Sequence, residues 1–91
     1  MVEQTTTVVN RDGLHMRPSM VITDVASQFQ SKITLTKEDT EIEAHSIMQV
    51  TMLAAVRGDA IIVKAEGDDE KEAVAAIVAV IESGFSEVYS E

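Results

Sequence analysis

Cysteine and tryptophan are absent from this 91-residue chain, and aromatic residues make up only 3% of it. Without cysteine the protein forms no disulfide and has no thiolate nucleophile, so we expect it to fold by packing alone in a reducing compartment. With so few aromatic side chains the core must be aliphatic, and the 45% hydrophobic content is sufficient for one core. We therefore predict a single domain over residues 1–91.

Long apolar runs and positive charge are also scarce. The longest apolar stretches, such as residues 73–81, are much shorter than the ~20 residues that span a bilayer, and the first residues lack a basic segment followed by an apolar one. These absences predict a cytoplasmic protein without membrane insertion. The chain has 7 lysine and arginine residues against 16 aspartate and glutamate residues, a formal net charge of −9. This charge disfavours nucleic acid as a partner, so we expect the partners to be proteins. We also expect a monomer.

Hydrophobic periodicity predicts the order of strands and helices. Period-two alternation and β-branched runs indicate strands, whereas apolar residues spaced i, i+4 and i+8 indicate the buried stripes of helices. The order is β-α-β-β-α-β-α, which predicts an α+β domain with three helices covering one face of a four-stranded sheet. The second and third strands form a hairpin, and the rest of the sheet order is left open. The predicted strands are residues 5–9, 32–36, 41–44 and 59–66, and the predicted helices begin near residues 16, 47 and 70. The buried stripe of the first helix is predicted to be Val21, Ile22, Val25, Ala26 and Phe29. That of the third helix is predicted to be Ala73, Ile77, Val80 and Ile81.

The second helix is predicted from its end signals. Ser46 is a favoured N-cap residue directly before the apolar residues 47–56, and Gly58 follows them. A buried strand is the competing interpretation of this run, but its length and its methionine, leucine and alanine content favour a helix.

The third helix is predicted to begin with a capping box. Asp69 would be its N-cap, and Glu72 would reach back to it. Gly84 is expected to end the helix. The sequence leaves open whether the tail residues Phe85, Val88 and Tyr89 pack against the domain.

His15 lies three residues before Pro18, the only proline of the chain. Proline is favoured in the first helical turn, so the helix starts at about residue 16 and His15 lies near its N-cap. The unpaired N–H groups and the positive end of the helix dipole stabilise an anion there, and Arg17 adds a charged planar fork. Such a position disfavours the imidazolium form of His15 and favours a phosphorylated one. The pattern therefore suits a phosphoryl carrier.

A lone histidine is more commonly a cap or a surface residue than a functional one. Here only the neighbouring residues favour a functional role for His15. Nothing else in the chain completes an enzyme, because there is no second base, no phosphate-binding glycine loop and no metal-ligand spacing. A metal site built from His15 and His45 lacks a third ligand. We therefore predict a carrier rather than an enzyme, with no metal and no cofactor, and with His45 on the surface between a strand and a helix.

Residues 13–18 (GLHMRP) resemble the active-site signature of the HPr family, the histidine-containing phosphocarriers of the bacterial phosphotransferase system. Residues 45–50 (HSIMQV) resemble the second signature of that family at the expected distance, and the resemblance covers essentially the whole chain. It implies an open-faced β-sandwich of four antiparallel strands under three helices. It also implies that His15 receives a phosphoryl group from enzyme I, which phosphoenolpyruvate charges, and donates it to enzyme II A domains, while Arg17 interacts with that group.

The resemblance assigns roles to the second signature as well. Ser46 matches a serine that a dedicated ATP-dependent kinase, the HPr kinase/phosphorylase, phosphorylates in some lineages and thereby weakens phosphotransfer. Ile47 and Met48 match part of an apolar docking surface for partner proteins. Met16 and Gln49 are expected to belong to the same partner-binding surface.

Asp12 departs from the family pattern, which commonly has asparagine or serine near the phosphoryl group. A carboxylate at this position repels a phosphate unless Arg11 or Arg17 compensates for it. The expected consequence is a less stable phosphohistidine.

Two alternatives to a sugar-transport carrier remain open. One is a regulatory phosphocarrier that signals through protein partners without moving sugar. The other is a non-catalytic binding module controlled at Ser46 alone, which would have no need of His15.

Overall fold

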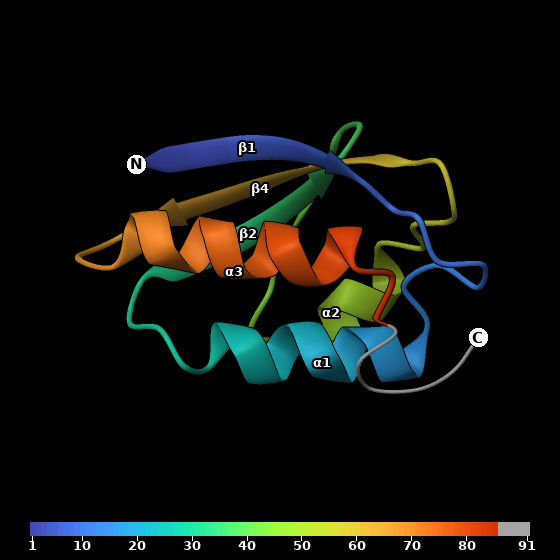
Figure 1. Ribbon diagram of the computed structural model, residues 1–91, viewed down its shortest axis with the longest axis horizontal. Helices are drawn as coiled ribbons and strands as arrows, with labels where there is room; N and C mark the ends of the chain where they lie inside the picture. The colour runs from blue at the N-terminus through green and yellow to red at the C-terminus, as the bar shows by residue number, and fades with distance from the viewer. Residues whose placement is uncertain (86–91) are drawn as a thin grey trace.

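The computed structural model describes residues 1–85 and has its elements in the predicted order, β-α-β-β-α-β-α (Figure 1). Four strands form one layer and the three helices lie on one face of it, which confirms the predicted α+β class. Val88 and Tyr89 lie outside the described residues. The strands are β1 (Val2–Thr7), β2 (Lys32–Lys37), β3 (Thr40–Glu43) and β4 (Ala60–Glu66), and the helices are α1 (Met16–Ala26), α2 (Ile47–Met52) and α3 (Glu70–Glu82).

The sheet has the strand order β1-β4-β2-β3, and all neighbouring strands are antiparallel. β2 and β3 form the predicted hairpin, in which Lys37 pairs with Thr40. β1 lies at one edge and pairs with β4 from Val2 opposite Ala65 to Thr7 opposite Ala60. The first strand of the chain is therefore completed by the last.

The core lies between the sheet and the helices and is aliphatic apart from Phe85, which is wholly buried. Every second residue of β2 and β4 points into it, as a strand with one covered face requires. The predicted helix stripes are confirmed at their centres, whereas Val21, Val25, Phe29 and Val80 are partly buried at the margin. The central core residues are Ile22, Ala26, Ile33, Leu35, Ile61, Val63, Ala65, Ala73, Ile77 and Ile81.

β1 was expected over residues 5–9, and this boundary is wrong because the strand covers Val2–Thr7. After Thr7 the chain leaves the ladder: the Val8 N–H donates to the Asp59 carbonyl at 3.0 Å, and the Val8 carbonyl accepts from the Gly58 N–H at 2.8 Å. The β-branched side chains predict a strand, but its ends are set by the hydrogen-bond partners that β4 offers. The other three strands agree with their predicted ranges to within one residue at each end.

α2 is shorter than the predicted range of residues 47–56. It ends at Met52, with Leu53 as its C-cap, and Ala54 then adopts a left-handed backbone with φ of 55°. Alanine rarely adopts this conformation, so the sequence carries no sign of the stop. Gly58, expected just after the helix, instead lies in the loop of residues 53–59 that leads to β4.

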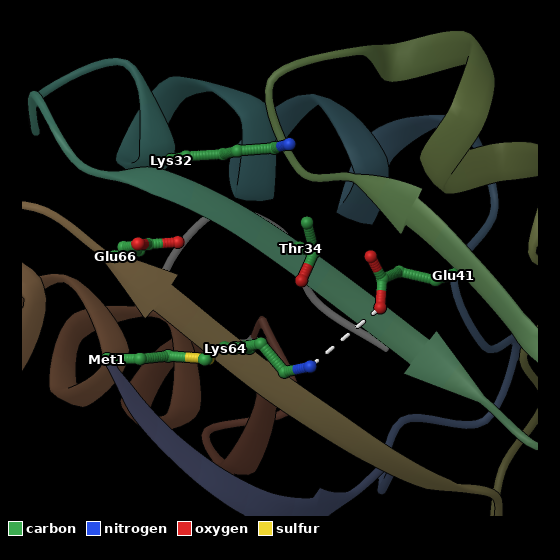
Figure 2. Close-up of a pocket in the computed structure, with 6 residues that line it drawn as sticks. All are labelled: Met1, Lys32, Thr34, Glu41, Lys64 and Glu66. Carbon is green, nitrogen blue, oxygen red and sulfur yellow. Dashed lines mark ion pairs between the residues drawn. The ribbon is translucent and has the colours of Figure 1, made fainter.

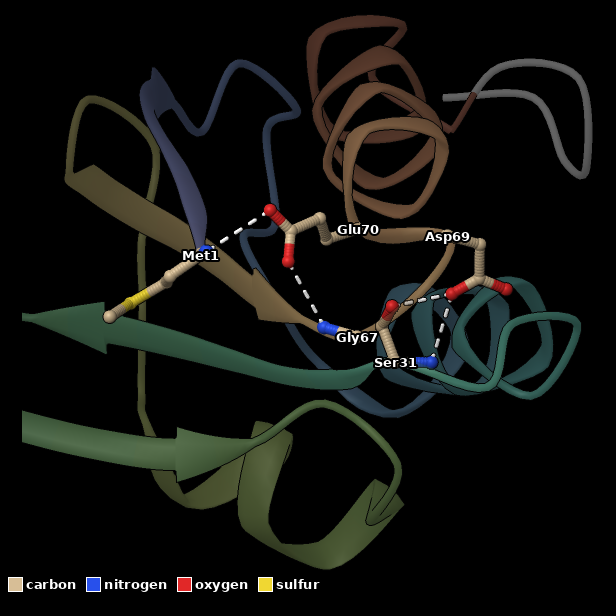
Figure 3. Close-up of polar contacts among 5 residues, drawn as sticks. All are labelled: Met1, Ser31, Gly67, Asp69 and Glu70. Atoms are coloured by element: carbon tan, nitrogen blue, oxygen red, sulfur yellow. Dashed lines mark hydrogen bonds and ion pairs between the residues drawn. The ribbon is translucent and has the colours of Figure 1, made fainter.

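The predicted capping box at the start of α3 is wrong. Asp69 is the N-cap residue, but its side chain caps nothing in the helix. Its carboxylate instead accepts hydrogen bonds from the Ser31 N–H at 3.0 Å and the Ser31 hydroxyl (Figure 3). It also accepts from the Gln30 N–H at 2.9 Å. The next residue, Glu70, accepts from the Gly67 N–H at 3.1 Å and pairs with the Met1 amino group at 3.0 Å. Asp69 therefore joins the start of α3 to the loop that precedes β2.

The Asp69 contacts predict a pH-dependent contribution to stability. The hydrogen bond from the Ser31 hydroxyl, followed by that from the Gln30 N–H, holds the pKa of Asp69 below its ordinary value of 3.8. A carboxyl whose pKa is lowered by folding stabilises the fold above its unfolded pKa, and this contribution is lost as the pH falls through the folded pKa. We expect Asp69→Asn to lower the melting temperature at pH 7, and the difference from the wild type to shrink as the pH falls below 3.8.

Asp68→Asn is the matched control, because Asp68 is the exposed neighbour of Asp69. Thermal unfolding of the three proteins from pH 7 to pH 2 checks the prediction. A difference between wild type and Asp69→Asn that stays constant over this range would contradict it. The pKa values of Asp59 and Glu70 are also lowered by hydrogen bonds, and the comparison cancels their contribution because both residues are present in each variant.

Candidate functional site

His15 is the N-cap residue of α1 and its side chain is exposed. Its backbone is extended, and its carbonyl accepts the first helical hydrogen bond, from the Ser19 N–H at 2.9 Å. The imidazole makes no capping hydrogen bond to the helix, so the ring is not used to stabilise the helix end. The predicted helix start near residue 16 is confirmed.

A tight turn before His15 fixes the direction in which the chain enters α1. Asn10 is buried, and its side-chain amide donates to the Gly13 carbonyl at 2.7 Å, while the Gly13 N–H donates to the Asn10 carbonyl at 3.2 Å. Gly13 has φ of +72°, and a Cβ added there would lie 2.4 Å from the carbonyl oxygen of Ala55. The Leu14 N–H donates to that same oxygen at 3.0 Å. The loop after α2 therefore supports the residue next to His15, a contact that sequence reasoning missed.

A contact between two hydroxyls, of buried Ser19 and partly buried Thr51, links α1 and α2. The Ser19 hydroxyl, which is fully buried, donates to the Leu14 carbonyl at 3.1 Å and lies 3.3 Å from the Thr51 hydroxyl. Pro18 stands four residues after Leu14 and has no N–H to offer that carbonyl, so the serine supplies the donor. Neither hydroxyl was singled out from the sequence, because serine and threonine on a helix carry no distinctive pattern.

The charged residues near His15 leave the helix N-terminus open to an anion. The first turn of α1 contains no acidic residue, and Arg17 is exposed within it. The Asp12 carboxylate lies 3.7 Å from Nε of Arg11, and both side chains are largely exposed. A pair this exposed contributes little to stability, but it places a positive charge beside the one carboxylate of the turn.

Ser46 is the N-cap of α2, as predicted. Its hydroxyl oxygen accepts a hydrogen bond from the Gln49 N–H at 3.2 Å, and its side chain is only partly exposed. The Gln49 side chain turns back and accepts from the Glu43 N–H at 3.0 Å. The predicted partner-binding amide of Gln49 is therefore engaged within the fold. His45 is on the surface, as expected, with Nε2 3.4 Å from the Ser31 carbonyl.

Exposed apolar side chains gather on α1 and α2. Of the three apolar residues predicted for partner binding, Met16 is 58% exposed, Met48 is 74% exposed and Ile47 is partly exposed. The sequence interpretation missed Met20, which is 46% exposed, and Met52, which is 72% exposed. Met16 and Met20 are four residues apart on α1, and Met48 and Met52 are four residues apart on α2, so each pair shares one helix face. We call these four residues the methionine cluster.

The open face of the sheet carries a different feature, shown in Figure 2. A shallow hollow of about 210 Å³ lies there, lined by alternate strand residues that point away from the core. Its charges are mixed, and Nζ of Lys64 lies 3.9 Å from a carboxylate oxygen of Glu41. None of the candidate site residues lines it. The lining residues are Met1, Lys32, Thr34, Glu41, Lys64 and Glu66.

Within residues 1–85, no group of three histidine or acidic residues is placed to hold a metal ion. Over the same range no helix has the length and apolar character needed to cross a bilayer.

Comparison with known proteins places these features in a family. Residues 2–83 match the family described as the PTS HPr component phosphorylation site. The phosphocarrier protein HPr of Neisseria meningitidis serogroup A is 40% identical over 96% of this chain and 98% of its own length. The phosphocarrier protein NPr of Proteus mirabilis is 44% identical over 88% of this chain and 90% of its own. The crystal structure of an HPr from Thermoanaerobacter tengcongensis is 40% identical and has a TM-score of 0.91, with 98% of this chain and all of that chain covered.

Proposed function

Since this chain belongs to the HPr family of phosphocarrier proteins of the phosphotransferase system, we propose that His15 is its phosphorylation site. In this proposal enzyme I, charged by phosphoenolpyruvate, delivers the phosphoryl group to His15, and an enzyme II A domain accepts it next. The chain acts as a monomeric carrier in the cytoplasm and is a substrate of these enzymes rather than an enzyme itself. The observation that carries the proposal is the imidazole of His15 at the N-terminus of α1, which is exposed and makes no capping hydrogen bond.

The transfer step needs only groups that this site offers. An unprotonated ring nitrogen of His15 attacks the phosphorus held by enzyme I, so that an N–P bond forms on His15 and the bond to the donor breaks. The negative charge that arrives is stabilised by the first N–H groups of α1 and by the guanidinium of Arg17. The resulting phosphoramidate is reactive enough to pass the group on.

Incubation with enzyme I and labelled phosphoenolpyruvate tests the proposal. We expect an acid-labile label on the wild-type protein, and a phosphorus–nitrogen resonance that NMR assigns to the His15 ring. The absence of any label would overturn the proposal, as would a label that is stable to acid.

The partner surface in this proposal is formed by Met16, Ile47 and Met48, with Gln49 at its edge. Exposed apolar residues beside a transferable group favour a protein that docks over them. Because the Gln49 amide already accepts from Glu43, we assign it to support the start of α2 and expect the other three residues to contribute most of the contact.

A regulatory phosphocarrier is the second candidate function. Relatives named HPr and relatives named NPr match this chain at similar identities, 40% and 44%. Measuring phosphoryl transfer from the phosphorylated chain to each enzyme II A domain of the same genome distinguishes the two functions. Acceptance by a sugar-specific domain supports transport, and acceptance only by a domain without a sugar permease supports regulation.

Asp12→Asn is expected to lengthen the lifetime of phosphohistidine severalfold. The Asp12 carboxylate repels a phosphoryl group on His15, and the exposed pair with Arg11 screens it only weakly. The rate of label loss at pH 8 gives the lifetime, and Asp24→Asn, on an exposed residue of the second half of α1, is the control. An unchanged or shorter phosphohistidine lifetime in Asp12→Asn would contradict the claim that the Asp12 carboxylate destabilises the phosphoryl group.

Ser46→Asp is expected to slow phosphoryl transfer from enzyme I. We propose that Ser46 is a target of an HPr kinase/phosphorylase, whose product would add about two negative charges at the start of α2, beside the partner surface. Aspartate supplies one charge and is itself a good N-cap residue, so the fold should persist. Ser46→Asn, an uncharged N-cap, is the control, and equal transfer rates for Ser46→Asp and the wild type would count against this regulation.

A further inference from the structure

Four of the five methionines of this chain lie on α1, which begins directly after His15, and on α2. Met16 follows His15 directly, and Met20 lies one turn further along the same face of α1. Met48 and Met52 form the equivalent pair on α2. The Ser19 and Thr51 hydroxyls, 3.3 Å apart, hold the two helices together beside the second member of each pair. The only other thioether is that of Met1, directly before β1.

The exposure of these side chains decides what can reach them. The cluster residues are between 46% and 74% exposed, and Met1 is 68% exposed. A small oxidant in solution therefore meets all five sulfur atoms. The chain has no cysteine, so no thiol competes for the oxidant, and methionine sulfur is its most readily oxidised group.

Oxidation changes the property for which this surface is suited. A thioether is apolar and polarizable and fits an apolar partner, whereas a sulfoxide is polar and chiral. A partner that docks over the cluster would have to bury each S=O group, and a buried polar group without a hydrogen-bond donor is unfavourable. The change is reversible, because sulfoxide reductases restore the thioether.

We propose that the methionine cluster is a site of reversible oxidation that switches off docking of the phosphoryl donor. Hydrogen peroxide transfers one oxygen atom to sulfur: the S–O bond forms, the O–O bond breaks and water leaves, while sulfur loses two electrons and the peroxide gains them. A sulfoxide reductase reverses the step with two thiols, which leave as a disulfide together with water. This inference rests on the proposed function, since it concerns the surface through which enzyme I would reach His15.

The test combines graded oxidation with transfer rates. The protein is treated with increasing hydrogen peroxide, sulfoxides are assigned to each methionine by peptide mass spectrometry, and phosphoryl transfer from enzyme I is timed. Each rate is divided by the untreated rate of the same variant. Met1→Leu removes the methionine outside the cluster. The four-leucine variant, which combines Met16→Leu, Met20→Leu, Met48→Leu and Met52→Leu, removes the cluster with little change in volume.

We expect treated wild type and treated Met1→Leu to lose transfer about tenfold or more, and the four-leucine variant to keep its untreated rate. A methionine sulfoxide reductase should restore the first two, and circular dichroism should show the fold intact throughout. Transfer at the untreated rate with all four cluster sulfurs oxidised would overturn the inference. Equal losses in the four-leucine variant would do so as well, because the damage would then lie elsewhere.

Binding of enzyme I separates this inference from the proposed function. The affinity of enzyme I is measured for His15→Ala before and after oxidation, since this variant is not expected to take the phosphoryl group. If affinity falls on oxidation while the wild type is never labelled, the inference holds and the proposed function fails. If the wild type is labelled but oxidation leaves the affinity unchanged, only the inference fails.

Discussion

Replacing His15 by alanine is expected to abolish acid-labile phosphorylation by enzyme I, whereas His45→Ala should retain it. His15 lies exposed at the N-terminus of α1, where a transferred phosphoryl group meets unpaired N–H groups and Arg17. His45 is exposed as well, but it lies before α2 with its ring next to the Ser31 carbonyl. The two variants therefore compare the same residue type in two electrostatic settings.

Loss of the label in His15→Ala can be attributed to the missing imidazole only if the variant remains folded. The His15 side chain makes no capping hydrogen bond, and exposed substitutions of this kind change stability by about 0.5 kcal/mol or less. Urea unfolding of both variants checks this. Label retained on His15→Ala would locate the phosphoryl group elsewhere, and partner binding and cellular output retained without any label would favour the non-catalytic module controlled at Ser46.

Gly13→Ala is expected to destabilise the fold by about 2–5 kcal/mol, as the sum of a strained backbone and a steric clash. Gly13 has φ of +72°, and its new Cβ would lie 2.4 Å from the Ala55 carbonyl oxygen and 3.0 Å from Val56 Cα. Both neighbours are backbone atoms, so neither can move aside by rotating a side chain. The contact that would be pushed apart is the one in which Leu14 donates to Ala55, so His15 should be displaced and phosphoryl transfer slowed as well.

Gly58→Ala provides the control for that prediction. Gly58 has φ of +95°, but no heavy atom lies within 4 Å of a Cβ added there. It therefore reports the backbone strain without the clash. Gly13→Ala should lower the free energy of unfolding, measured in urea, by more than Gly58→Ala does, and equal values would contradict the proposed packing of the turn against the loop of residues 53–59.

The parts of the site that the sequence predicted are those with local causes. Pro18 constrains the start of α1 because its ring fixes φ and removes an N–H. The place of His15 at the start of this helix could therefore be predicted. Ser46 was predicted as an N-cap because its hydroxyl bonds to Gln49, only three residues on. The helix stripes were predicted because one face of each helix packs on the core and the other faces solvent. The spacing of apolar residues in the sequence indicates which face is buried.

The parts that could not be predicted depend on residues far apart in the chain. The capping box expected at Asp69 was wrong because its carboxylate found donors at Gln30 and Ser31, which no local pattern foretells. The early end of α2 depends on Ala54, a residue type that gives no warning of a left-handed backbone. Met52 was missed for a related reason: Gln49 and Thr51 are the only polar residues between positions 47 and 56, so periodicity could not separate the exposed face of the helix from its buried one.

The position of β1 at the sheet edge beside β4 has a consequence for synthesis. During synthesis β1 emerges before β4, the strand that pairs with it from Val2 opposite Ala65. The hairpin of β2 and β3 can close long before, because its loop is short. β1 therefore stays unpaired and exposed to water until β4 has been synthesised, and an unpaired strand is prone to aggregation. Its sequence, with Glu3, Gln4 and a run of threonines, keeps the β-forming backbone while leaving little apolar surface exposed during that delay.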